Sequence, residues 1–109
     1  MIPASVRIFV CTEPVDMRFG FDRLAARIRD EMKQDPQGGS LFIFANRRAT
    51  RLKVLWSERH GLCMLYKRLH RASFEVPRDG QSLSVTIDAK QLAKLLEGVP
   101  RGGRPRRTR

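Results

Sequence analysis

A segregated group of basic side chains is the part of this sequence whose residue types and spacing could do chemistry. Residues 47–71 carry eight lysines and arginines against one acid, Glu58, and residues 101–109 add five arginines and no acid. A guanidinium group presents planar, paired donors that suit phosphate oxygens, and clustered charge of one sign indicates a polyanionic partner. The candidate nucleic-acid-binding residues are Arg47, Arg48, Arg51, Lys53, Lys67, Arg68, Arg71, Arg104, Arg106 and Arg107.

The alternating pattern of the segment 51–56 predicts how some of these charges are displayed. A strand here would place Arg51 and Lys53 on one face of a sheet, beside a turn that carries Arg47 and Arg48. Such a basic ridge could follow a phosphate backbone. The alternative is a solvated sheet face that binds an acidic protein, and the density of arginine favours nucleic acid.

Two aromatic residues, Trp56 and Tyr66, lie in the same basic region. Either side chain could stack on a base, but aromatic residues in alternating strands are more often part of the core. The sequence favours the core for Trp56. It leaves both possibilities open for Tyr66, because a tyrosine hydroxyl tolerates a position at an edge.

Acidic residues near the start of the chain offer the main catalytic alternative. Glu13, Asp16 and Asp22 are close in sequence, and three carboxylates could hold the magnesium that a nuclease needs. Asp16, however, precedes a predicted helix, where a capping aspartate is common, and Asp22 falls on that helix's exposed side. The sequence contains no recognisable catalytic triad, phosphate-binding glycine loop or four-ligand zinc pattern. It therefore predicts a protein that is not an enzyme, with no catalytic residue, metal or cofactor.

The size and composition of the chain set its class. With 109 residues, of which 41% are hydrophobic, we expect one domain over residues 1–100. No signal-like start and no apolar run of about 20 residues is present, so we expect a cytoplasmic protein without a membrane partner. Cys11 and Cys63 lie in apolar runs, which favours free thiols over a disulfide.

Hydrophobic periodicity predicts two helices among several short strands. A stripe from Phe21 to Met32 has helical spacing. Asp88 and Gln91 form a capping box that begins a second helix, and Gly98 and Pro100 end it. Strands are expected at 6–10, 41–44, 51–56, 62–67, 73–76 and 83–86.

These elements predict an α+β fold. We expect an antiparallel sheet of about five or six strands, with a meander over 41–67 and with two helices packed on one face. The segment 101–109 has no large apolar side chain and is expected to be a disordered, arginine-rich tail until it is bound.

Three stretches of the chain also resemble a known family. They are Val15–Leu24 (VDMRFGFDRL), the segments from Leu41 to Phe74 that include Asn46-Arg47-Arg48 and Arg51–Leu55, and Gln91–Gly98. In this order they are similar to the small accessory proteins (TnpB, or second-ORF-like proteins) of the IS-sixty-six family of bacterial insertion sequences. The resemblance covers about residues 6 to 99.

The resemblance implies an accessory role in DNA transposition, beside a separate and larger transposase. It carries over no catalytic residue, and it marks Asp16, Arg18 and Asn46 as a candidate functional surface. We therefore expect non-catalytic binding to DNA, first of all to the ends of the element, with the transposase as a second partner. The alternative is a protein–protein adaptor that binds the transposase without touching DNA.

Overall fold

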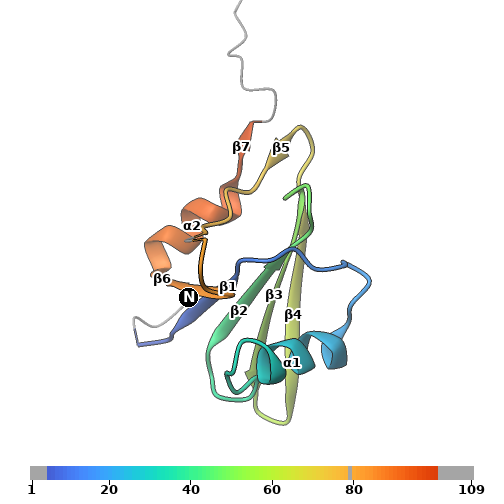
Figure 1. Ribbon diagram of the computed structural model, residues 1–109, viewed down its shortest axis with the longest axis vertical. Coiled ribbons are helices and arrows are strands. Elements are labelled where there is room, and N and C mark those ends of the chain that lie inside the picture. Colours follow the sequence, from blue (N-terminus) through green and yellow to red (C-terminus); the bar gives the residue numbers. More distant parts are fainter. Residues whose placement is uncertain (1–4, 79, 101–109) are drawn as a thin grey trace, which may run out of the picture.

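A single five-stranded sheet organises the molecule. The structure is a computed structural model that describes residues 5–78 and 80–100. The sheet has the strand order β4-β3-β2-β1-β6, and two short strands, β5 and β7, pair separately (Figure 1). The elements are β1 (Ile8–Cys11), α1 (Phe21–Asp30), β2 (Leu41–Ala45), β3 (Arg51–Glu58), β4 (Gly61–Arg68), β5 (Ala72–Ser73), β6 (Ser84–Ile87), α2 (Ala89–Glu97) and β7 (Val99–Pro100).

The pairing of the strands confirms the predicted α+β class and the antiparallel meander over β2, β3 and β4. In that meander Phe42 lies opposite Leu55, and Val54 lies opposite Leu65. One pair differs from the expectation, because β1 and β2 are parallel. Parallel neighbours need a crossover connection, and α1 supplies it. The strand expected at 73–76 is shorter than predicted, because only Ala72–Ser73 forms a strand. It pairs with β7, outside the main sheet.

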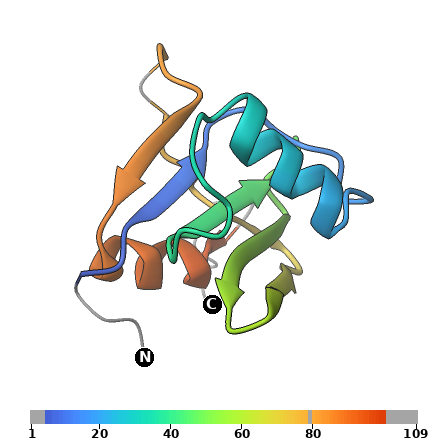
Figure 2. The same cartoon turned by 90° about the horizontal axis from the view of Figure 1, so that it is seen from below.

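The two helices lie on opposite faces of the sheet, so the prediction that both pack on one face is wrong. Figure 2 shows the sheet between α1 and α2. The physical reason lies in the central strands, where Phe42 and Phe44 point to one face and Ile43 to the other, and all three are buried. A strand that is apolar on both faces needs cover on both sides.

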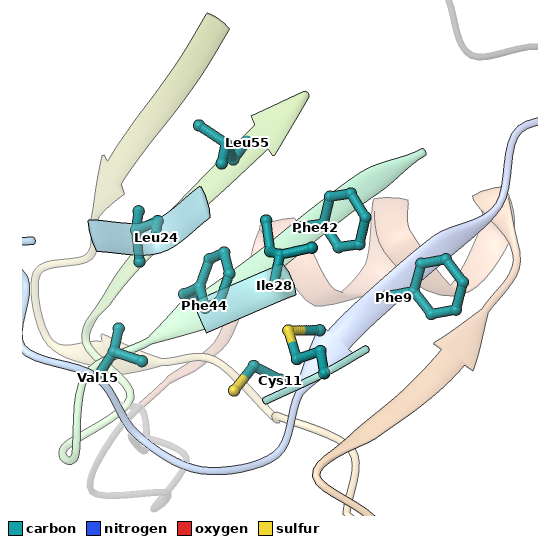
Figure 3. Close-up of a cluster of buried hydrophobic side chains, with 9 residues drawn as sticks. Phe9, Cys11, Val15, Leu24, Ile28, Phe42, Phe44 and Leu55 are labelled. Atoms are coloured by element: carbon teal, nitrogen blue, oxygen red, sulfur yellow. The ribbon is translucent and has the colours of Figure 1, made fainter. Parts of the chain in front are cut away.

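The core on the α1 side is rich in aromatic residues. Leu24 and Ile28 of α1 pack over Phe42, Phe44 and Leu55 of the sheet (Figure 3). Phe9 stacks on Phe42 with ring centroids 5.4 Å apart. The apolar helix face predicted from Phe21 to Met32 is only partly buried. Phe21 is 45% exposed, and Met32 is buried but lies beyond the end of α1.

The core on the other face is aliphatic and lies beneath α2. Leu92 and Leu95 of α2 pack with Ile8, Val10 and Ile43 of the sheet. The capping box that the sequence predicts is present: the Asp88 carboxylate accepts a hydrogen bond from the Gln91 backbone N–H, and the Gln91 side chain accepts one from the Asp88 N–H. Cys11 and Cys63 are free cysteines, as expected, and burial raises the pKa of the Cys11 thiol.

Candidate nucleic-acid interface

An open hollow of about 550 Å³ lies where the loop after β1, the β2–β3 turn and the paired strands β3 and β4 meet. Two of the three stretches that carry the sequence resemblance reach it, the loop around Asp16 and the turn around Asn46, although about 30 residues separate them in the chain. We call this site the arginine hollow. Its lining residues are Val15, Asp16, Met17, Arg18, Asn46, Arg47, Arg48, Arg51 and Tyr66.

The β2–β3 turn is shaped by the side chain of Asn46. Its Oδ1 accepts hydrogen bonds from the backbone N–H groups of Thr50 and Arg51, both at 2.9 Å. Asparagine commonly closes turns in this way, and the turn also contains Ala49 with a φ of +56°. Asn46 therefore holds the turn that presents Arg47 and Arg48, and it also lines the hollow.

The loop before α1 is fixed to the sheet by Lys53. The Lys53 Nζ donates to the carbonyl oxygens of Met17 at 2.7 Å and Phe19 at 2.8 Å, and the residue is only 7% exposed. At the other end of this loop, the Val15 N–H donates to the Ala45 carbonyl at 2.9 Å. The expectation that Lys53 contributes to a phosphate-binding ridge is therefore wrong, because its ammonium is used inside the protein.

Asp16 and Arg18 form an ion pair at the rim of the arginine hollow. The guanidinium of Arg18 contacts both carboxylate oxygens of Asp16, the shortest contact being 2.7 Å. Hydrogen bonds from the Arg18 side chain and then from its backbone N–H lower the pKa of Asp16 to about 2. Asp16 is thus ionised at neutral pH, and it balances the charge of Arg18 rather than capping α1, whose N-cap is Gly20.

Three further arginines supply the positive charge of the arginine hollow. Arg47, Arg48 and Arg51 are exposed, and none of them forms an ion pair with an acid in residues 5–78 or 80–100. Arg68 lies directly opposite Arg51 in the β3–β4 pairing, which places both side chains on the same face of the sheet. Like charges held close together without an acid are costly unless an anion joins them.

Of the other predicted basic residues, Lys67 and Arg71 do not line the arginine hollow. Lys67 lies opposite Leu52, whose side chain faces the α2 core, and its Nζ donates to the Leu96 carbonyl at 2.6 Å. This bond satisfies a carbonyl near the end of α2, and it directs the Lys67 ammonium toward α2 rather than toward the arginine hollow. Arg71 is exposed in the connection between β4 and β5 and does not line the hollow. The predicted tail residues Arg104, Arg106 and Arg107 lie outside the described residues.

The acidic residues considered for a magnesium site are each placed differently. Glu13 contacts Arg27 at 3.4 Å, and Asp16 is paired with Arg18. In the part of the chain that the structure describes, no three His, Cys, Asp or Glu side chains come together as a group able to hold a metal ion. Across the same residues, no helix is long and apolar enough to cross a membrane.

Sequence reasoning missed two features of the site. It did not foresee that Lys53 is buried, although a signal was present: Lys53 lies two residues before Leu55 in β3, so both side chains are on the face that α1 covers. It also left the place of Tyr66 open, whereas the structure puts Tyr66 in the arginine hollow with 51% of its surface exposed. Trp56 packs against the aliphatic core, as the sequence favours.

Comparison with known proteins finds a family model and two relatives that match most of the chain. Residues 6–104 match a family model described as IS66 Orf2 like protein. An uncharacterized protein of Sinorhizobium fredii, y4hO, is 39% identical over 101 residues, which cover 91% of this chain and 87% of the relative. A second uncharacterized protein of the same organism, y4jC, is 34% identical over 97 residues, or 87% of this chain and 80% of the relative. No solved structure matches the chain.

The fold and the site define a small basic α+β protein that displays an arginine-lined surface. The family match covers almost the whole chain, so the chain belongs to the IS66 Orf2-like family and is an accessory protein of a bacterial insertion sequence. The resemblance predicted from its motifs is thereby confirmed.

Proposed function

We propose that the protein binds DNA without catalysing a reaction, and that the arginine hollow is the binding surface. The observation that carries the proposal is the convergence of Arg47, Arg48 and Arg51, which are exposed and lack acidic partners in the described residues. Guanidinium groups in this setting are strong ligands for phosphate oxygens. In transposition such a protein would help to hold the ends of the element beside the transposase.

The arrangement of the hollow supports sequence-independent contact with the backbone. The basic side chains come from a turn and a strand end whose backbone is fixed by internal hydrogen bonds. Phosphate contacts of this kind orient a protein on DNA but carry no sequence information. We therefore assign to the hollow sequence-independent affinity for DNA, and not the recognition of a particular sequence.

A salt titration tests this proposal. If Arg47, Arg48, Arg51 and Arg68 each neutralise one phosphate, affinity for duplex DNA should fall roughly 150-fold between 50 and 200 mM salt, because counterion release contributes about 0.9 to the slope per contact. The measurement is an electrophoretic shift or fluorescence anisotropy titration on a terminal repeat and on a random duplex of equal length. Binding that does not change with salt would contradict the proposal.

A second candidate function is a protein adaptor for the transposase, and one feature of the sheet favours it. Strand β4 lies at an edge of the sheet and carries Leu65, which is 44% exposed. An edge strand offers backbone groups to which a partner's strand can be added.

Capture of the transposase on the tagged accessory protein separates the two functions. An adaptor should retain the transposase after nuclease treatment, and Leu65→Lys should release it. If nuclease digestion removes the transposase, DNA is the bridge and the adaptor role is wrong.

A further inference from the structure

Tyr66 adds an exposed aromatic ring to the arginine hollow, and phosphate binding alone does not need such a ring. Its side chain is 51% exposed and lies among the arginines that line the hollow. By contrast, the aromatic residues of β1 and β2, which are Phe9, Phe42 and Phe44, are buried beneath α1. The Tyr66 ring therefore adds exposed apolar area to a basic surface, where a ligand in the hollow can cover it.

The ring is also held in place from within the protein. The Lys53 Nζ lies 4.9 Å from the centroid of the Tyr66 ring, and the same Nζ is bonded to the carbonyls of Met17 and Phe19. Lys53 and Tyr66 are directly opposite each other in the β3–β4 pairing. One face of the ring therefore rests on a fixed cation, and the exposed area remains for a ligand in the hollow.

An exposed aromatic ring beside arginines suits an unpaired nucleotide. Single-stranded nucleic acid is bound by aromatic side chains on which bases stack, next to basic side chains that hold the backbone. Within a duplex, neighbouring bases cover both faces of each base, so Tyr66 cannot stack on an internal base pair. The volume of the hollow, about 550 Å³, is in the range of pockets that take small organic ligands, roughly 300–1,000 Å³.

We propose that the arginine hollow takes an unpaired nucleotide of single-stranded DNA, with its base on Tyr66 and its flanking phosphates on Arg47, Arg48 and Arg51. This inference rests on the proposed function and adds the kind of DNA that the site prefers. Because every base has a stacking face, the preference concerns strandedness and not sequence. The protein would accordingly favour frayed or displaced strands over an intact duplex.

The test compares an oligothymidine single strand with an abasic strand of the same length, which keeps every phosphate and sugar but lacks the bases. For the natural protein we expect affinity for the abasic strand to be lower by roughly 5- to 150-fold, the range that corresponds to one stacked base. In Tyr66→Ala the two strands should bind almost equally. Tyr66→Trp keeps a stacking surface and should keep the difference, with indole fluorescence quenched by oligothymidine and not by the abasic strand.

The outcomes separate this inference from the proposed function. Equal binding of both strands by the natural protein, with affinity that still depends on Arg47, Arg48 and Arg51, would overturn the stacking role and leave phosphate binding intact. Binding of neither strand, nor of duplex, would overturn the proposed function itself. A stronger preference for the corresponding RNA strand would overturn the assignment to DNA.

Discussion

A variant in which Arg47, Arg48 and Arg51 are all replaced by glutamine is expected to bind DNA roughly 100-fold more weakly at about 100 mM salt. Each lost phosphate contact removes about 0.9 from the salt slope for a duplex, so the slope itself should fall by close to three. The loss should be similar for all sequences, because contacts to phosphates do not read bases. Anisotropy titrations at several salt concentrations measure both the affinity and the slope.

A matched control removes the same charge elsewhere. Arg7, Arg59 and Arg78 are exposed and do not line the arginine hollow. Their combined replacement by glutamine lowers the net charge equally, so general attraction to DNA falls by the same amount. If this control loses as much affinity as the hollow variant, the protein binds through its overall charge and the hollow is not the binding surface.

Replacing Lys53 by methionine is expected to lower the free energy of unfolding by about 2–3 kcal/mol. The variant keeps most of the apolar stem but removes the ammonium that holds the carbonyls of Met17 and Phe19. A hydrogen bond to a charged group contributes about 1.5–3 kcal/mol, and two bonds from one group are not fully additive. Urea unfolding followed by circular dichroism gives the change.

Arg51→Met is the control for Lys53→Met, because it removes a cation two residues away on the same face of the same strand. The Arg51 side chain is exposed and makes no ion pair in the described residues, so its loss should change stability by no more than about 0.5 kcal/mol. It should instead lower the salt slope of DNA binding by about 0.9. The opposite result, in which Lys53→Met keeps stability but lowers the slope, would make Lys53 a phosphate ligand after all.

The sequence predicts best those features that depend on neighbouring residues. The capping box of Asp88 and Gln91 needs only a spacing of three residues, and it is present as expected. The meander over β2, β3 and β4 follows from short connections between alternating segments. The placement of the helices depends instead on which face of the sheet each one covers. The strand Leu41–Ala45 is apolar on both faces, and this pattern indicates that both faces of the sheet are covered. One helix on each side provides that cover.

The candidate site was predicted only in part, because its members come together through strand register. The clustered arginines of the β2–β3 turn are visible in the sequence. Whether a basic side chain in β3 or β4 faces the hollow, the core or α2 depends on pairing partners that lie far along the chain. The sequence pattern alone therefore predicts surface positions for Lys53 and Lys67. In the structure, the ammonium group of each donates hydrogen bonds to backbone carbonyls instead.

The pairing of β5 with β7 places the last described residues, Val99 and Pro100, near the arginine-bearing β2–β3 turn. The Phe74 N–H donates to the carbonyl of Ala49 in the arginine-bearing turn, and the adjacent Ser73 lies opposite Val99. Pro100 is followed in the sequence by nine residues that include five arginines, and nine residues span at most roughly 30 Å. If DNA binds in the arginine hollow as proposed, we expect the five arginines of this segment to act on the same strand at a high effective concentration, as an intramolecular second contact.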